Sequence, residues 1–275
     1  MQTVRRQIRR KKRLPRPAPL SPSRQHPLML VWQPCHSRSG RPLRFAVFRK
    51  AFRRRLRAAV AHHRMALLDW LALPDGVLLL CDPASLAQLA AFVAMLKSTA
   101  AADARRRHPD RQLWRGRYAL TLVEPAALAQ CVLTMDLAAT AAGLVLHPAA
   151  WPDSGWHELA GLRQRYRLLL PTAAKAAIAA VQDPGRRSYV TLTEECLRSR
   201  RYGSLQPWTT ALAVGQPEWT ERLLASVPEG SRRLASLTAG DLPLDTPAPL
   251  LAVTAGRRRS RDLVYAILRA ARGPA

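Results

Sequence analysis

Apolar residues recur along the N-terminal half of the chain with spacings that predict strands and helices in alternation. A short apolar run at residues 28–32 predicts a strand. Beyond it, apolar side chains recur at every third or fourth position, at Phe45, Phe48, Phe52, Leu56 and Val60. This spacing predicts a helix with one apolar face and with its arginines on the opposite face.

Two longer apolar runs follow, at residues 65–73 and 76–81, and a Pro-Asp pair separates them. Their length and the turn-forming residues between them predict a β-hairpin in the middle of a sheet. The next segment begins with Asp82-Pro83, which predicts a capped helix start. The apolar stripe of this helix extends to about Arg107.

A further strand at residues 117–124 and a helix at 125–140 complete this half of the chain. The order strand, helix, strand, strand, helix, strand, helix predicts an antiparallel sheet with helices on one face. Residues after about 157 have mainly helical patterns, broken by turns that contain glycine and proline. The predicted fold class is therefore α+β, with a mainly helical C-terminal extension.

The charge of the chain indicates the kind of partner that it binds. The chain has 275 residues, with 44 Lys and Arg against 18 Asp and Glu, which gives a formal net charge of +26. Nineteen of the basic residues lie between Arg5 and Arg64, and residues 1–68 contain no Asp or Glu. Such a concentration of like charge either forms a solvated tail or binds a polyanion, of which nucleic acid is the commonest. We expect phosphate binding.

The first residues form an arm of unusual composition. Residues 1–27 combine the run RRQIRRKKR with five prolines, which predicts a disordered basic arm. We therefore expect three parts: this arm, a folded domain at 28–157 and the C-terminal extension at 158–275. An organellar transit peptide would also be basic, but the prolines would break its helix. No apolar signal segment or membrane span is predicted, so we expect a cytoplasmic, nucleoid-associated protein.

Three segments resemble motifs of a known family. The segment LWRGRYALTLVE at residues 113–124 matches a signature LWQGRYKAxLVE, and MDLAATAAGLVLHPAAWPDSG at 135–155 is similar to IELNPVRAGLVxxPxxWPWSS. Upstream, LPDGVLLLC at 73–81 lies where MPNHxHLLL is usual. The family is that of the bacterial REP-associated tyrosine transposases, single-tyrosine members of the HUH superfamily. The resemblance covers about residues 28–155 and implies a ferredoxin-like, HUH-type sheet.

The catalytic residues that the resemblance implies are missing from this chain. Family members hold a divalent metal with two histidines on one strand, and a tyrosine attacks the scissile phosphate. The corresponding positions here are Gly76, Leu78 and Ala100. No histidine lies between His63 and His108, so a shifted alignment does not restore the pair. The resemblance therefore implies DNA binding without cleavage, with no catalytic residue, no metal and no other cofactor.

The basic positions of the resemblance are retained. We expect hairpin or other structured single-stranded DNA to contact the arm and the basic positions of the aligned segments. The candidate nucleic-acid-binding residues are Arg5, Arg6, Arg9, Arg10, Arg38, Lys97, Arg105, Arg106, Arg107, Arg115 and Arg117. RNA stays open as an alternative because a basic arm binds RNA phosphates equally well. Relatives act as monomers or dimers, so a homodimer also stays open.

A second interpretation is an active transposase or nuclease with a non-standard site. Asp75 and Asp82 flank the second strand of the hairpin and offer carboxylates for Mg²⁺ or Mn²⁺, while Tyr118 or water would attack the phosphate. Carboxylates beside turns and helix starts are more often turn and cap residues. The four cysteines lie about fifty residues apart and show neither a zinc-site nor a disulfide pattern.

Overall fold

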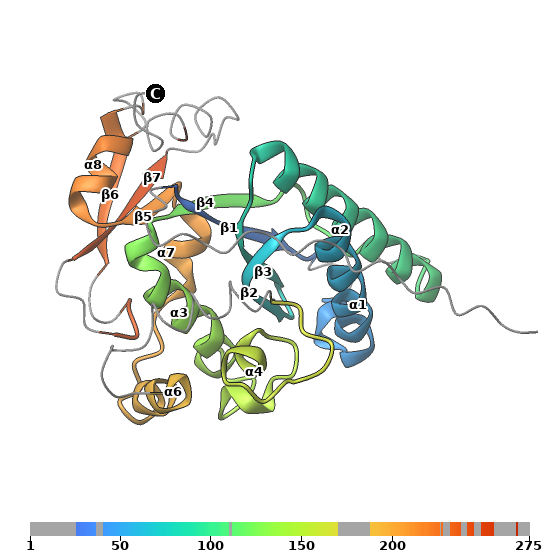
Figure 1. Ribbon diagram of the computed structural model, residues 1–275. Helices are drawn as coiled ribbons and strands as arrows, with labels where there is room; N and C mark the ends of the chain where they lie inside the picture. Colours follow the sequence, from blue (N-terminus) through green and yellow to red (C-terminus); the bar gives the residue numbers. More distant parts are fainter. Residues whose placement is uncertain are drawn as a thin grey trace, which may run out of the picture.

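The computed structural model places the strands in one mixed sheet (Figure 1). It describes residues 26–36, 41–109, 112–169, 188–225, 227, 232–237, 241–244, 249–255 and 268. The strands in these ranges are β1 (Leu28–Pro34), β2 (Ala66–Leu73), β3 (Gly76–Asp82), β4 (Ala119–Val123), β5 (Ala213–Gly215), β6 (Arg232–Leu237) and β7 (Leu250–Ala255). Their order across the seven-stranded sheet is β2-β3-β1-β4-β5-β7-β6. Neighbouring strands are antiparallel except β4 and β5, which are parallel.

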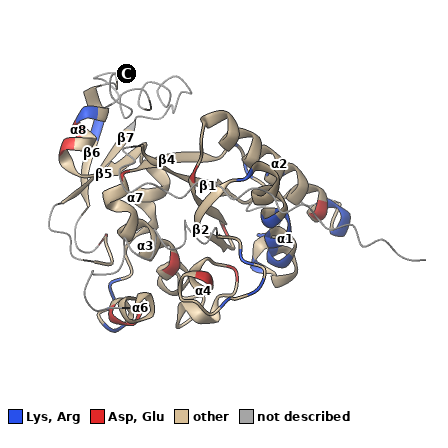
Figure 2. Ribbon diagram, viewed as in Figure 1, with Lys and Arg blue, Asp and Glu red and all other residues tan. Residues whose placement is uncertain are grey.

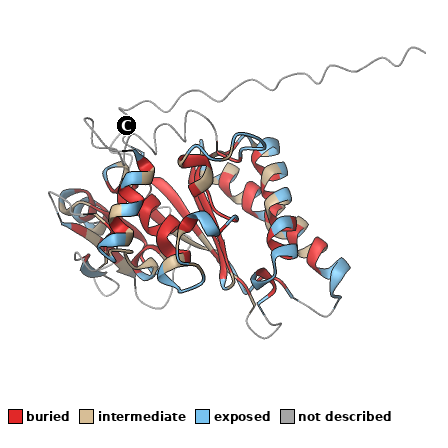
Figure 3. Cartoon of the chain, turned by 90° about the horizontal axis from the view of Figure 1, so that it is seen from below, coloured by how far each residue is buried: buried red, intermediate tan, exposed pale blue. Residues whose placement is uncertain are grey.

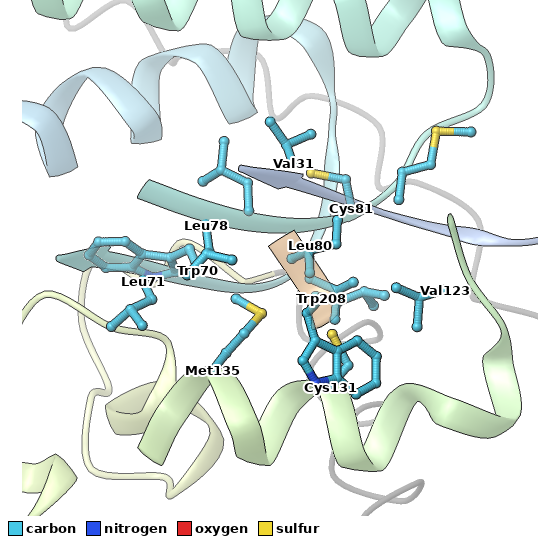
Figure 4. Packing of buried hydrophobic residues seen from close by; sticks show 14 of the residues in the cluster. Val31, Trp70, Leu71, Leu78, Leu80, Cys81, Val123, Cys131, Met135 and Trp208 are labelled. Atoms are coloured by element: carbon cyan, nitrogen blue, oxygen red, sulfur yellow. The ribbon is translucent and has the colours of Figure 1, made fainter. Parts of the chain in front are cut away.

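Helices cover both faces of this sheet. They are α1 (Ala46–His63), α2 (Leu86–Arg107), α3 (Leu128–Ala141), α4 (Trp156–Leu159), α6 (Tyr189–Arg198), α7 (Leu205–Thr210) and α8 (Pro217–Ala225). Short 3-10 turns are η1 (Pro42–Arg44), η2 (Pro125–Ala127) and η3 (Pro148–Ala150). The helices α1 and α2 lie against each other on one face, whereas α3 and α7 lie on the other (Figures 1 and 4). The α+β class predicted from the sequence is confirmed.

The two helical layers follow from strands that are apolar on both faces. All seven residues of β3 are buried. Leu80 lies toward α3 with Met135 and Trp208, whereas its neighbour Cys81 lies toward α1 and α2 (Figure 4). Figure 3 shows the result, with buried residues along the sheet and exposed residues on the outer sides of the helices. The sequence pattern predicted helices on one face only, and the structure adds the second layer.

The strand β2 lies at one edge of the sheet, and a later segment of the chain covers it. The N–H of Ala72 donates to the carbonyl of Asp153 at 2.9 Å, and the N–H of Gly155 donates to the carbonyl of Trp70 at 2.7 Å. This cover occupies backbone groups that would otherwise be open to pairing with another chain. The predicted hairpin is therefore present as β2 and β3, but at the edge of the sheet rather than in its middle.

The C-terminal residues extend the same sheet. The strand β5 joins it beside β4, where the N–H of Leu122 donates to Leu212 at 2.8 Å and the N–H of Glu124 donates to Val214 at 3.0 Å. The strands β7 and β6 follow in order. The sequence pattern predicted mainly helix here and missed these strands, which are three to six residues long.

The start of α2 differs from the predicted one by a few residues. Ser85 is the N-cap, and its hydroxyl accepts a hydrogen bond from the N–H of Gln88 at 3.1 Å. Asp82, predicted as the cap, is instead the buried last residue of β3.

Within the described ranges, no helix combines the length and the apolar character that a membrane span needs.

Candidate nucleic-acid interface

Charges of opposite sign are segregated in the first half of the described chain. Residues 26–36, 41–109 and 112–117 contain four acidic residues, and Asp69, Asp82 and Asp103 are buried. Asp75 is exposed, and its carboxylate pairs with Arg41 at 3.1 Å. Lysines and arginines, in contrast, gather on α1 and at the end of α2 (Figure 2). This half of the molecule therefore presents an excess of positive charge to solvent.

Some of the arginines of α1 hold the fold together. Arg49 is buried, and its Nε donates to the carboxylate of Asp153 at 2.8 Å. The guanidinium also donates to the carbonyls of Leu43 and Arg44 and lies 4.4 Å from the ring centroid of Trp151. The sequence pattern predicted the arginines of this helix on its solvent face. That prediction is wrong for Arg49, because the buried Asp153 draws its guanidinium inward.

A second acidic residue gathers arginines from both helices. The carboxylate of Asp103, on α2, lies 3.1 Å from Arg54, 2.7 Å from Arg55 and 3.5 Å from Arg106. Hydrogen bonds from Arg55 and Arg54 hold the pKa of Asp103 well below its ordinary value. One carboxylate cannot neutralise three guanidinium groups, so this cluster is positive. Arg54 and Arg106 remain mostly exposed and accessible to an anion.

The exposed cations of α1, α2 and the following loop are here called the basic surface. They are Lys50, Arg54, Arg105, Arg106, Arg107, Arg115 and Arg117. Five of the six described positions that the sequence predicted as nucleic-acid-binding belong to it, from Arg105 to Arg117. Arg5, Arg6, Arg9, Arg10 and Arg38 lie outside the described residues.

Lys97 has a different position from the other predicted residues. It is half-buried, and its Nζ donates to the carbonyl of Gly116 at 3.0 Å. Burial lowers the pKa of Lys97. Gly116 adopts a φ of 59°, which glycine tolerates without strain. Lys97 therefore fixes the turn from which Arg115 and Arg117 project.

Two further contacts fix the same loop. The N–H of Arg115 donates to the carbonyl of Pro34 at 3.0 Å, and the indole N–H of Trp114 donates to the carbonyl of Lys97 at 2.9 Å. The side chains of Arg115 and Arg117 are exposed, and neither has an ion pair within the described part of the chain. Anchored backbone and exposed guanidinium groups suit contact with phosphate.

The two positions that the sequence resemblance aligns with histidines lie inside the core. Gly76 and Leu78 share the face of β3 that also carries Leu80, and this is the face toward α3 (Figure 4). Leu78 is 0% exposed. A Cβ at Gly76 would lie 2.6 Å from both the ring of Trp32 and the carbonyl of Gln33. The structure has no room for a metal-binding side chain at Gly76.

Ala100 does not join these two positions. It is buried on α2, which lies on the opposite face of the sheet from Gly76 and Leu78 (Figures 1 and 4). The structure therefore does not bring the three aligned positions together. The face of β3 that carries Gly76 and Leu78 is covered by α3, where Thr134 is buried with its hydroxyl lacking a partner in the described residues.

The residues proposed for a non-standard catalytic site are also far apart. Asp75 precedes β3 and Asp82 ends it, a separation of about 20 Å along an extended strand. Tyr118 is half-buried and packs against the core. Among the described residues, no three His, Cys, Asp or Glu side chains lie close enough together to hold a metal ion. Asp75 and Asp82 cannot share one ion.

The local sequence pattern alone did not identify Lys50 and Arg54 as part of the basic surface. Lys50 and Arg54 are four residues apart on the outer side of α1, a spacing that places them on one face. Their exposure could be inferred from that spacing. The distinction between them and the inward Arg49 could not, because its partner Asp153 is 104 residues away in the chain.

No protein-family model matches the chain, and no curated protein matches its sequence. Among solved structures, the chain is similar to a REP-associated tyrosine transposase bound to a REP hairpin, with a TM-score of 0.39 and 12% sequence identity. The match covers 57% of this chain and 90% of that one.

Proposed function

We propose that this chain binds nucleic acid through its basic surface, and that its preferred ligand is structured single-stranded DNA such as a hairpin. The segregation of charge carries this proposal. Cations of α1, α2 and the 115–117 loop are exposed, while the acidic residues of the same region are buried except Asp75. A surface of this kind attracts a polyanion and releases its counterions on contact.

The basic arm at residues 1–27 adds to the affinity in this proposal. Its contacts are electrostatic, so they strengthen binding to any nucleic acid and discriminate little between sequences. The choice of hairpin DNA rests on the resemblance of residues 113–124 and 135–155 to the REP-associated tyrosine transposases.

We also propose that binding occurs without strand cleavage. Leu78 is completely buried and Gly76 is packed against Trp32, so neither position can present a metal ligand to DNA. Incubation of the full chain with end-labelled hairpin DNA and Mg²⁺ or Mn²⁺ tests this on a denaturing gel. Intact strands support the proposal. Cut strands, or a covalent protein–DNA band lost in Tyr118→Phe, would establish an active enzyme instead.

The binding proposal is tested by the salt dependence of affinity. Fluorescence anisotropy with a labelled hairpin is measured over a range of NaCl concentrations for the wild-type chain and for a variant with Arg105, Arg107, Arg115 and Arg117 changed to alanine. Four lost phosphate contacts lower the slope of log affinity against log salt by about 3. A control changes Arg198 and Arg222, which are exposed on α6 and α8, to alanine. It removes two charges rather than four, so the two variants are compared per removed charge.

The two variants separate the possible results. We expect the control to bind with the wild-type affinity and slope, and the basic-surface variant to bind weakly with a flatter slope. A basic-surface variant that keeps the wild-type slope would remove this surface from the proposal. Equal losses per removed charge in the two variants would indicate that net charge, rather than this surface, determines binding.

A further inference from the structure

An aromatic side chain is exposed at the start of α1. Phe45 belongs to the apolar stripe that the sequence predicted, but 42% of it is exposed, whereas Phe48 and Phe52 are buried. Phe45 is the N-cap residue of α1, and Val47 beside it is 50% exposed. An apolar patch therefore opens to solvent where the buried stripe of the helix begins.

Cations and a second exposed ring surround this patch. The guanidinium of Arg44 lies over the Phe45 ring, 5.2 Å from its centroid. The Phe45 ring is 6.4 Å from the ring of Phe48, which in turn is 5.5 Å from the ring of His108. His108 is exposed and directly follows the three arginines at the end of α2. The patch is thus continuous with the basic surface.

The combination of an exposed ring and cations limits what can bind there. A purely apolar partner would leave the guanidinium groups near Phe45 without counter-charges. Duplex DNA supplies phosphates, but its bases are stacked on each other and present no free face. An unpaired nucleotide supplies both a phosphate for the arginines and a planar base for the ring.

We propose that Phe45 is a stacking platform for an unpaired base of the bound nucleic acid, with Arg44 and the end of α2 holding the neighbouring phosphates. This inference rests on the proposed function and adds the kind of ligand to it. The ring is held in place by Phe48, so little conformational freedom is lost when a base stacks on it.

The test compares two DNA hairpins with the same stem, each closed by a non-nucleotide linker so that no loop base is unpaired. One is blunt, and the other carries an unpaired tail with 2-aminopurine, a base whose fluorescence is quenched when it stacks. The variant Phe45→Leu keeps an apolar side chain but removes the ring. We expect it to bind the tailed hairpin at least about fivefold more weakly and to lose the quench, while its affinity for the blunt hairpin stays unchanged.

Two further variants complete the design. Phe45→Trp keeps an aromatic face, so we expect it to retain both the affinity for the tailed hairpin and the quench. Leu146→Ala removes an exposed apolar side chain elsewhere on the surface, at a residue that is 96% exposed. We expect this control to behave like the wild type with both hairpins.

The outcomes separate this inference from the proposed function. If the wild-type chain binds neither hairpin, the proposed function fails and the stacking site fails with it. If the wild type binds both and Phe45→Leu equals it in affinity and quench, the stacking site alone is overturned. Equal loss on both hairpins also overturns it, because Phe45 would then act through the fold. A change confined to self-association, measured by sedimentation, would make the ring a protein contact instead.

Discussion

The Nε of Arg49 donates to Oδ2 of Asp153 at 2.8 Å, and both side chains are buried. This pair connects α1 to the segment that covers the edge of β2, so it joins the helix of the basic surface to the far side of the hairpin. Arg53 binds the other oxygen of the same carboxylate at 3.2 Å. The arginines that bind Asp153 therefore stabilise the fold, whereas the exposed arginines of the basic surface remain available to a ligand.

Removal of this pair destabilises the fold. Arg49→Met keeps the apolar length of the side chain but leaves a buried carboxylate with one partner, and we expect a loss of roughly 3 kcal/mol in the free energy of unfolding. Urea unfolding followed by circular dichroism measures it. The adjacent Lys50→Met is the control, since an exposed substitution changes stability by less than about 0.5 kcal/mol. Similar losses in the two variants would contradict a structural role for Arg49.

The glycine at position 76 is required by packing. Its added Cβ would lie 2.6 Å from the Trp32 ring and from the Gln33 carbonyl, so Gly76→Ala should cost about 1–3 kcal/mol of stability. Thermal unfolding gives the difference. The double variant with Trp32→Leu should recover part of the loss, because the ring is one of the two obstacles. If Gly76→Ala is as stable as the wild type, the position is open and packing does not require a glycine there.

A buried carboxyl makes stability depend on pH. Asp136 accepts a hydrogen bond from the hydroxyl of Tyr189, and burial raises the pKa of Asp136 to about 8 from its ordinary value of 3.8. Burial also raises the pKa of the nearby Asp69, and the negative charge of Asp136 raises it further. The folded chain therefore keeps a proton that the unfolded chain releases.

The sign of the pH effect follows from that raised pKa. The stability is fully present below the unfolded pKa near 4 and is lost as pH rises toward the folded pKa near 8. We expect the free energy of unfolding to fall between about pH 5 and pH 8, and to fall less in Asp136→Asn. The exposed Asp75→Asn serves as the control and should keep the wild-type slope. Stability that rises with pH, or an unchanged slope in Asp136→Asn, would contradict the raised pKa.

Lys97 and its neighbouring arginines should differ in how they affect binding. Lys97 donates to the carbonyl of Gly116 and so positions the turn that carries Arg115. We expect Lys97→Met to weaken hairpin binding without changing its salt slope, because no phosphate contact is removed. Arg115→Ala should lower the slope by about 0.7 to 0.9. An equal decrease in slope for Lys97→Met would show that its ammonium contacts phosphate directly.

The sequence predicted the helices and strands better than it predicted which of them pack against one another. The hairpin at 65–73 and 76–81 agrees with β2 and β3 to within a residue at each end, because two long apolar runs around a turn have few alternatives. The helix predicted from the stripe between Phe45 and Val60 agrees with α1. Periodicity reports which face of an element is apolar, and it does not report which other element covers that face.

Long-range contacts explain which buried and exposed side chains the local sequence pattern did not distinguish. Arg49 and Arg55 look equivalent to Lys50 and Arg54 in the local pattern, and only the distant Asp153 and Asp103 distinguish them. The exposure of Phe45 is another such case. It matches the spacing of the stripe, but it lies at the N-cap, beyond the residues that the sheet covers.

Chemical modification of arginines locates the nucleic-acid interface on the protein. Arginines are modified with phenylglyoxal in the presence and absence of hairpin DNA, and the modified positions are identified by mass spectrometry. We expect DNA to protect Arg105, Arg107, Arg115 and Arg117 but to leave Arg198 and Arg222 as reactive as in the free protein. Protection confined to the arm at residues 1–27, or no protection at all, would contradict binding through the basic surface.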